Sequence, residues 1–331
     1  MLEAVFYLGA GKSCRSANDR ELIHFGKPEG CIEAAIFSQG REQTLKARLS
    51  VNTRRSLFVN EVKLATPREL LGRLPCVFFG PEELGIVRAG ASARRRYMDL
   101  ALCQLRPRYM ALLAEYNRLH KHKTRLLRDA APGSAMASVL PDFNRRMAEV
   151  GAGIVFCRAD FVKRAALSAS GFHQEAAGDR ETLCLSYVTK PVFDENLSQG
   201  VYARILYEYL KDKEPSEWAA GRCLAGPHRD DIETSVGGVS AREYGSQGQT
   251  RTAALAMKMA ERQIFREELG AYPVLLLDDV LSELDAHRQE FVLNHIEEGQ
   301  VLITCCEDGT RFPAANTIKV KEGKAKPCIS I

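Results

Sequence analysis

The sequence of 331 residues lacks the patterns typical of secreted, membrane-spanning or zinc-stabilised proteins. Its ten cysteines form no Cys-x-x-Cys pair, and its seven histidines form no ligand-spaced cluster with them, which argues against a structural zinc site. It has no signal peptide and no apolar run of about 18 residues, so we expect a cytoplasmic protein with reduced thiols and no membrane contact. Cys305 and Cys306 follow an apolar strand and are predicted to be buried small hydrophobic residues.

The sequence also lacks a complete phosphate-binding loop of the form GxxxxGK[ST]. Gly11-Lys12-Ser13 resembles the end of such a loop, but Phe6 stands where its first glycine is required. The tripeptide also follows a predicted helix instead of preceding one. Lys12, Arg15 and Arg20 are therefore interpreted as a basic loop at the end of that helix, which either contacts DNA or has no partner.

The composition is that of a globular protein, with 45% apolar residues and a net charge of +4. The length predicts one large or two modest domains. The charge is unevenly distributed: residues 88–128 contain eleven Lys or Arg and two acidic residues, which leaves a local net charge of +9. This segment is a candidate phosphate-facing surface, and a solvated helix face is the alternative. Its candidate DNA contacts are Arg94, Arg95, Arg96, Lys121 and Lys123.

The order of predicted elements indicates an α/β body interrupted by helices. Short strands are expected at residues 32–37, 45–51, 56–62 and 76–79. Apolar residues then recur at helical spacing along 109–119, after a break at Pro107, and again along 143–167, so these segments predict an antiparallel helical hairpin. Further elements are expected at 183–188 (strand), 201–211 (helix), 246–269 (helix), 274–277 (strand) and 301–303 (strand).

An apolar strand ending in two carboxylates is the first motif that carries chemistry. Val274–Leu277 is a continuous apolar run, as in a central strand that is buried on both faces. Asp278 would stand at its carboxyl end, where α/β sheets place ligands, and could hold Mg²⁺. Asp279 could orient an attacking water. A polar loop after a core strand is the alternative interpretation.

Two neighbouring motifs favour the functional interpretation. Ser246-Gln247-Gly248-Gln249 opens a long helix, whose first N–H groups and positive dipole end suit a phosphate. Ser282 and Asp285 follow the acidic strand and add a hydroxyl and a carboxylate. Each motif alone is also compatible with an ordinary helix cap. Their order, within about 40 residues, predicts the second half of an ATP site.

With these motifs in place, the chain resembles the RecF family of bacterial recombination and repair proteins, which belongs with the ATPase heads of the Rad and structural-maintenance proteins. The resemblance covers nearly the whole chain. Besides Ser246–Gln249 and Asp278–Asp285, the segments that carry it are Leu2–Ala4, Gly11–Arg15, Asp19–Leu22, Pro81–Leu84, Arg94–Asp99 and Gly226–Asp231. Ala89-Gly90-Ala91 departs locally from the Gly-Ser-Pro type of turn that the family uses.

The resemblance implies an α/β fold of the ABC/SMC ATPase-head type with an inserted helical arm lobe. Residues 1–95 would form the N-terminal part of the head, residues 96–218 the arm, and residues 219–331 the C-terminal part of the head. The family has two strands and a phosphate loop before Leu2-Glu3-Ala4, roughly 35 residues at usual strand and loop lengths. These are missing here, so the chain as written is expected to bind ATP poorly, to lack ATP-dependent dimerisation and ATPase activity, and to be poorly soluble. A misassigned start and a genuine loss of the loop both remain open.

For the family's complete form, the resemblance implies an ATP-controlled DNA-binding protein with weak, DNA-dependent ATPase activity. Two heads would dimerise around ATP and Mg²⁺, with Ser246–Gln249 (the signature motif) facing the γ-phosphate bound to the other head. Asp278 would hold Mg²⁺, Asp279 would position water, Ser282 and Asp285 (the D-loop) would couple the two sites, and Thr304 would stand at the γ-phosphate sensor position.

The implied role lies in DNA repair, replication and recombination and in the SOS response. The implied partners are single-stranded, double-stranded and gapped DNA and other recombination mediator proteins, which would load recombinase at gaps. Two alternatives come from other classes. A nucleotide-free DNA-binding scaffold would keep the basic surface of residues 88–128, and a transporter ATPase subunit is disfavoured by the long helical arm.

Overall fold

The computed structural model describes residues 1–331 except 17, 39, 179–180, 306–315, 322–323 and 328–331. Its helices are α1 (Leu2–Ala10), α2 (Ala91–Leu105), α3 (Pro107–Asp129), α4 (Leu140–Ala177), α5 (Gln199–Ala220), α6 (Gln247–Leu269) and α7 (Ala286–Asn294). Its strands are β1 (Glu29–Ser38), β2 (Arg41–Ser50), β3 (Ser56–Val59), β4 (Val62–Lys63), β5 (Cys76–Phe79), β6 (Leu183–Val188), β7 (Asp231–Val236), β8 (Val239–Ser240), β9 (Val274–Asp278), β10 (Val301–Thr304), β11 (Ile318–Lys321) and β12 (Lys324–Pro327).

A small parallel sheet, with strand order β10-β9-β5, forms the part of the α/β body that positions the site. Leu275, Leu276 and Leu277 of the central strand β9 are fully buried, as the continuous apolar run predicts. Thr304 of β10 pairs with Asp278, and Phe79 of β5 pairs with Leu277. The three strands therefore end together, and the polar side chains that follow them share one edge.

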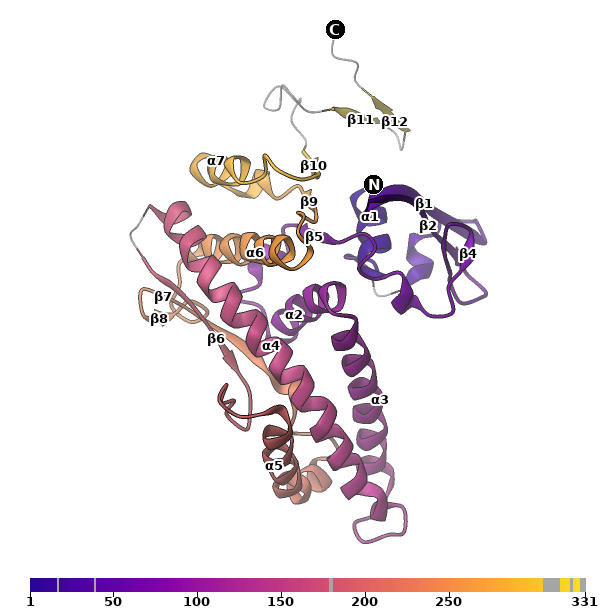
Figure 1. Cartoon of the computed structure of the whole chain (residues 1–331), viewed down its shortest axis with the longest axis vertical. Helices are drawn as coiled ribbons and strands as arrows, with labels where there is room; N and C mark the ends of the chain where they lie inside the picture. Colours follow the sequence, from indigo (N-terminus) through magenta and orange to yellow (C-terminus); the bar gives the residue numbers. More distant parts are fainter. Residues whose placement is uncertain (17, 39, 179–180, 306–315, 322–323, 328–331) are drawn as a thin grey trace.

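The N-terminal strands form a separate antiparallel sheet in the order β1-β2-β3-β4, beside α1 (Figure 1). The single strand expected at 56–62 is wrong, because β3 and β4 are two strands joined by a tight turn at Asn60 and Glu61. Both turn residues have positive φ, 49° and 63°. The Asn60 side chain holds the turn, since its Oδ1 accepts a hydrogen bond of 2.8 Å from the Thr44 N–H.

The predicted helical hairpin is formed by α3 and α4, which run side by side down the molecule (Figure 1). Pro107 is the first residue of α3, where its missing N–H removes no helical hydrogen bond. The expected division after residue 95 falls inside α2, and the division after residue 218 falls in the last turn of α5. β6, from the expected arm, pairs with β7 from the expected C-terminal part of the head.

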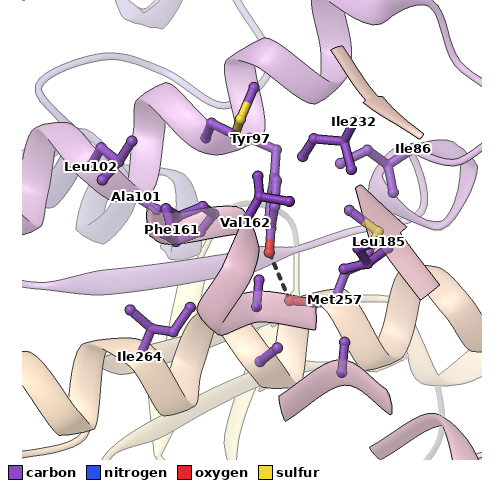
Figure 2. Close-up of a cluster of buried hydrophobic side chains, with 14 of the residues drawn as sticks. Ile86, Tyr97, Ala101, Leu102, Phe161, Val162, Leu185, Ile232, Met257 and Ile264 are labelled. Atoms are coloured by element: carbon purple, nitrogen blue, oxygen red, sulfur yellow. Dashed lines mark hydrogen bonds between the residues drawn. The ribbon is translucent and has the colours of Figure 1, made fainter. Parts of the chain in front are cut away.

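One large core joins the arm helices to the helix that precedes β9. Figure 2 shows Tyr97 of α2 among apolar side chains of α4, α6, β6 and β7. The Tyr97 hydroxyl donates a hydrogen bond of 2.9 Å to the Met257 carbonyl, and its ring meets Phe161 edge-on with centroids 5.6 Å apart. The buried hydroxyl is thus satisfied. This core fixes α6, and with it the Ser246–Gln249 turn.

The structure bears on two expectations from the sequence, the lack of a membrane-spanning helix and the burial of Cys305. Within the described residues, no helix combines the length and the apolar character needed to cross a membrane. Cys305 is exposed, so the prediction that it is buried is wrong: β10 ends at Thr304, and Cys305 already lies beyond the sheet. Cys306 lies outside the described residues.

Candidate functional site

The end of β9 places two neighbouring carboxylates in different environments. The Asp278 side chain is 15% exposed. Its Oδ1 accepts a hydrogen bond of 3.0 Å from the Thr304 hydroxyl, and its Oδ2 forms an ion pair with Arg15, from the loop after α1. Asp278 is therefore held from two sides, by the adjacent strand and by the basic loop.

Asp279 has a backbone conformation that is uncommon for residues with a side chain, with φ 52°. Its N–H donates a hydrogen bond of 3.0 Å to the Thr304 hydroxyl, and its carbonyl accepts one of 2.7 Å from the Ser282 hydroxyl. Thr304 and Ser282 thus hold the turn at Asp279. The structure brings together four of the predicted site residues: Asp278, Asp279, Ser282 and Thr304.

The side chains at this edge offer Mg²⁺ few protein ligands. Within the part of the chain that the structure describes, no group of three or more His, Cys, Asp or Glu side chains is arranged to hold a metal. Mg²⁺ in nucleotide sites keeps several waters and takes one or two protein carboxylates together with phosphate oxygens. Asp278 fits this role as a single carboxylate. A metal cage built from protein ligands alone does not fit here.

The Ser246–Gln249 turn begins α6 as predicted. Ser246 is the N-cap: its hydroxyl accepts from the Gln249 N–H at 3.2 Å, and Gln249 Oε1 accepts from the Ser246 N–H at 2.7 Å. This reciprocal pair is a capping box. Ser246 and Gln247 are exposed, so the first turn and the positive end of the helix dipole face outward. Gln249 is further held by Glu181, at 2.6 Å.

Arg288 links the D-loop to the signature motif, and the sequence analysis missed it. Asp285 is the N-cap of α7, and it also forms an ion pair with Arg288. The hydrogen bond from the Arg288 N–H, followed by the Arg288 charge, lowers the pKa of Asp285. The same guanidinium donates to the Thr252 hydroxyl at 2.7 Å and to the Gly248 carbonyl at 3.3 Å, both on α6.

Arg251 makes a second bridge between the same two elements. From α6 it donates to the Glu283 carbonyl and forms an ion pair with the Glu283 side chain, both at 2.8 Å. The Asp285-x-x-Arg288 spacing was the available sequence signal for the first bridge, because it brings an acidic N-cap and an arginine into the same helical turn. No comparable local signal pointed to Arg251.

The basic segment divides between buried and exposed side chains. Arg94 and Lys123 were predicted to contact DNA, and the structure contradicts both assignments. Arg94 is 2% exposed and pairs with Asp231 through two contacts of 2.6 and 2.9 Å. Lys123 is fully buried and lies 2.6 Å from the Glu217 carboxylate. Neither cation is available to a phosphate. Arg94 lies on the core side of α2 and Lys123 on the core side of α3, which a count of charges does not reveal.

The remaining basic candidates lie at or near the surface. Lys12, Arg20, Arg96 and Lys121 are exposed, and Arg95 is half-buried. Arg15 is exposed as well, although its guanidinium is paired with Asp278. These positions stay DNA-binding predictions.

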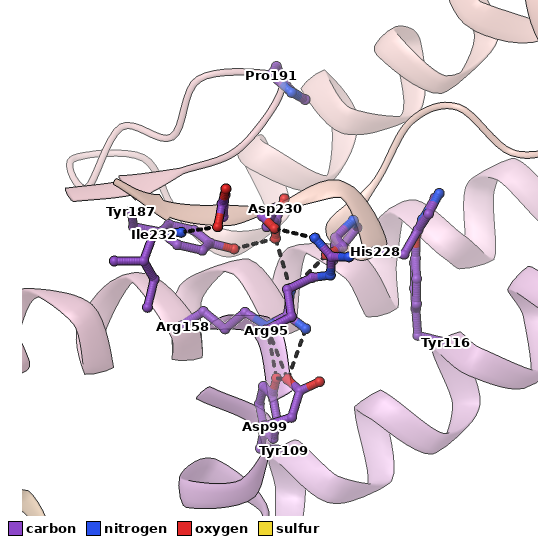
Figure 3. Close-up of polar contacts among 12 residues, drawn as sticks. Arg95, Asp99, Tyr109, Tyr116, Arg158, Tyr187, Pro191, His228, Asp230 and Ile232 are labelled. Carbon is purple, nitrogen blue, oxygen red and sulfur yellow. Dashed lines mark hydrogen bonds and ion pairs between the residues drawn. The ribbon is translucent and has the colours of Figure 1, made fainter. Parts of the chain in front are cut away.

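The segments Arg94–Asp99 and Gly226–Asp231, which carry part of the resemblance, form an interlocked buried network (Figure 3). At its centre Arg158 of α4, 3% exposed, pairs with Asp99 at 2.9 Å and with Asp230 at 3.1 Å. Its guanidinium also donates to the Pro227 carbonyl at 2.7 Å. Arg95 donates to the Asp230 carbonyl, also at 2.7 Å. These motifs therefore join α2, α4 and the start of β7.

The Gly226 position explains why glycine is required in this network. Its φ is 122°, and a Cβ atom there would lie 2.3 Å from the Tyr116 hydroxyl oxygen. That hydroxyl is hydrogen-bonded to His228 Nδ1 at 2.9 Å. Burial, followed by repulsion from His120, lowers the pKa of His228 to about 3. The imidazole is consequently neutral at physiological pH.

Comparison with known proteins relates this chain to one family along most of its length. No family model matches. The DNA replication and repair protein RecF of Agathobacter rectalis is 36% identical over 305 residues, which is 92% of this chain and 82% of that protein. RecF of Symbiobacterium thermophilum is 37% identical over 309 residues (93% and 82%), and RecF of a Synechococcus species is 35% identical over 334 residues (99% and 88%).

Solved structures agree with the sequence relatives. The recombination mediator protein RecF with ATP, described in the RecFOR pathway, superposes with a TM-score of 0.91 at 30% identity, covering 99% of this chain and 87% of that one. An Smc head bound to the C-winged helix domain of ScpA superposes with a TM-score of 0.53 at 15% identity, covering 99% and 84%, which supports the fold alone. The fold is thus that of an ABC/SMC ATPase head, and the chain belongs to the family of the DNA replication and repair protein RecF.

Proposed function

We propose that this protein is an ATP-controlled DNA-binding protein of recombinational repair and replication-fork maintenance. It would dimerise on ATP, bind DNA, hydrolyse ATP slowly and assist the loading of recombinase at gaps. Its partners would be gapped, single-stranded and double-stranded DNA, other recombination mediators and a second copy of itself, in the cytoplasm and within the SOS response. The observation that carries the proposal is the shared edge where Asp278, Asp279 and Thr304 meet.

Each side chain at that edge has a role that follows from its contacts. Asp278 would hold Mg²⁺, which would neutralise phosphate charge when it is bound with the nucleotide. The Thr304 hydroxyl is hydrogen-bonded to the Asp278 side chain and to the Asp279 N–H. A phosphate that bound this hydroxyl would therefore alter both hydrogen bonds. Asp279 would then orient the attacking water. Arg15 would have to leave Asp278 before a cation takes its place.

Dimerisation is supported by how the signature motif is presented. Ser246 and Gln247 are exposed at the start of α6, where they can meet a phosphate bound to a second copy. Arg288 and Arg251 tie this turn to the D-loop within one chain. Movement of either motif on ATP binding would therefore be transmitted to the other.

The test compares the wild type with Ser246→Arg, which adds bulk and charge at the exposed turn. Sedimentation with and without Mg-ATP reports the oligomeric state, and fluorescence anisotropy of labelled gapped DNA reports DNA binding. The proposal predicts that the wild type dimerises on Mg-ATP and then binds DNA more tightly, and this result would also overturn the expectation that a chain without a GxxxxGK[ST] motif binds ATP poorly. Ser246→Arg should stay monomeric and bind DNA equally with and without ATP. ATP-dependent dimerisation of this variant would contradict the role of the signature motif.

The alternative function is a nucleotide-free DNA-binding scaffold, favoured by the absence of a GxxxxGK[ST] motif from the sequence. Titration of the wild type with a fluorescent ATP analogue separates the two proposals. Saturable, Mg²⁺-dependent binding that Asp278→Asn weakens supports the ATP-controlled protein. Salt-dependent DNA binding without any binding of the analogue supports the scaffold.

A further inference from the structure

A groove of about 490 Å³ is lined by residues of the loop that follows α1, of α2 and of the first half of α3. It is separate from the edge at Asp278. The charged and polar residues that line it come from all three segments, namely Lys12, Ser92, Arg95, Arg96, Asp99, Gln104 and Asn117. Residues far apart in the sequence thus supply three cations, one carboxylate, a hydroxyl and two amides to one space.

The three cations have no carboxylate of their own. Within the described residues, none of Lys12, Arg95 and Arg96 forms an ion pair. Arg95 and Arg96 donate instead to backbone carbonyls, of Asp230 at 2.7 Å and of Cys14 at 3.2 Å. Asp99 also lines the groove, but its carboxylate is already paired with Arg158.

The Lys12 ammonium adds evidence of crowded positive charge. Loss of contact with water, followed by repulsion from Arg96, lowers the pKa of Lys12, although part of the side chain is exposed. An anion in the groove would relieve this repulsion. The positions of the side chains show the same excess of positive charge, since three cations without an ion pair line one groove.

The lining also contains apolar side chains. Leu71, Leu100 and Leu113 are half-buried and line the groove with the polar groups. A site for a small inorganic anion needs no such surface, whereas a nucleotide presents a flat base or a sugar as well as a phosphate. The volume is in the range of pockets that hold one small organic unit, and a duplex is too wide to enter it.

We propose that this groove binds one unpaired nucleotide of a nucleic-acid strand, with its phosphate at Lys12, Arg95 and Arg96 and its base or sugar against the leucines. The inference rests on the proposed DNA-binding function and deepens it. A single-stranded stretch, such as the strand opposite a gap, would enter the groove while duplex DNA stays outside. The site would thereby distinguish gapped DNA from duplex.

Two kinds of variant separate the phosphate contact from the apolar contact. Binding of a fluorescent 15-nucleotide oligothymidylate and of a duplex of equal length is measured by anisotropy over a range of salt concentrations. In the double variant Lys12→Gln/Arg96→Gln, oligothymidylate affinity should fall about tenfold, and its salt dependence should decrease by about 0.7 in log–log slope for each lost phosphate contact. Leu113→Asn should weaken the affinity without changing the slope. Duplex binding should change less in both variants.

Arg145→Gln is the matched control, because Arg145 is an exposed arginine of α4 outside the groove. It should bind as the wild type does, and thermal unfolding confirms that each variant is folded. If the wild type binds DNA and the double variant binds oligothymidylate with the same affinity, the groove is not the nucleotide site. The proposed DNA-binding function would still stand. No DNA binding by the wild type would overturn the proposed function itself. Competition by inorganic phosphate alone, without any change in oligothymidylate affinity of the variants, would make the groove a small-anion site and overturn the nucleotide assignment.

Discussion

The buried network around Arg158 and the edge at the end of β9 both contain short runs of charged residues, yet these side chains differ in exposure and in their partners. Arg158 and Asp230 are 3% and 1% exposed and make their contacts within the protein. Asp279 and the Ser246 turn have few internal partners beyond those that fix the backbone. The comparison teaches that charges with buried partners hold segments of the fold together, whereas carboxylates at an exposed strand end are candidates for binding or catalysis.

The first prediction sharpens this comparison at its buried end. Arg158→Ala should lower the free energy of unfolding by about 3–5 kcal/mol, because it leaves the buried Asp230 carboxylate without its cation. Urea unfolding followed by circular dichroism measures the change. The exposed Arg145→Ala should cost at most about 1 kcal/mol. A similar decrease in the free energy of unfolding in the two variants would show that the buried network contributes no more to stability than an exposed arginine does.

A second buried pair tests whether such networks are needed for stability at all. Lys123→Met alone should cost about 3 kcal/mol, since it strands the buried Glu217 carboxylate opposite an apolar side chain. The double variant Lys123→Met/Glu217→Met should recover most of this loss, because both charges are then gone. Thermal and urea unfolding of the two variants provide the measurement. A double variant as unstable as the single one would mean that packing, and not charge, dominates this position.

The neutral His228 makes the stability of the buried region depend on pH. The unfolded chain takes up a proton near the ordinary pKa of 6.5, whereas the folded chain does so only near 3. The free energy of unfolding therefore falls as the pH decreases from about 6.5 towards 3, by less than about 1.4 kcal/mol per pH unit. His120, which faces His228 with ring centroids 4.2 Å apart, also has a lowered pKa and acts in the same direction.

Replacing His228 should make this pH dependence shallower. Between pH 8 and pH 5, His228→Gln should lose about 2 kcal/mol less than the wild type does, as measured by urea unfolding at each pH. The exposed His122→Gln serves as the control and should follow the wild type. Parallel pH profiles for all three proteins would argue that His228 is protonated in the folded state.

The smallest effect on stability is expected beside the edge at the end of β9, where Arg288 of α7 joins the D-loop to α6. Asp285→Asn keeps an N-cap side chain and removes its charge, and Arg288→Gln removes the partner charge. The two substitutions together should show a coupling free energy of about 0.5–1 kcal/mol in urea unfolding. Strict additivity would mean that the ion pair contributes nothing and that the bonds to Gly248 and Thr252 hold the bridge.

Local pattern was enough to predict several elements of the site. The apolar run at Val274–Leu277 is the buried strand that was expected, and Ser246 caps a helix at the predicted residue. The turn at Asn60 and Glu61 was missed because only two polar residues separate the apolar run Leu57–Val59 from Val62, whereas the positive φ angles and the pairing of Val59 with Val62 reveal the reversal. Arg251 was missed because its partner Glu283 lies on another element.

The sequence by itself determined the buried strand at Val274–Leu277, the helix cap at Ser246, the helical hairpin and the family resemblance, because these depend on residue spacing within one segment. Tertiary structure alone decided which charges are usable. Arg94, Arg95 and Arg96 are consecutive, yet the first pairs with Asp231 inside the protein and the last lines an open groove. Successive residues of a helix point about 100° apart, so a run of like charges faces several environments. What each environment contains is set by segments that are distant in the chain.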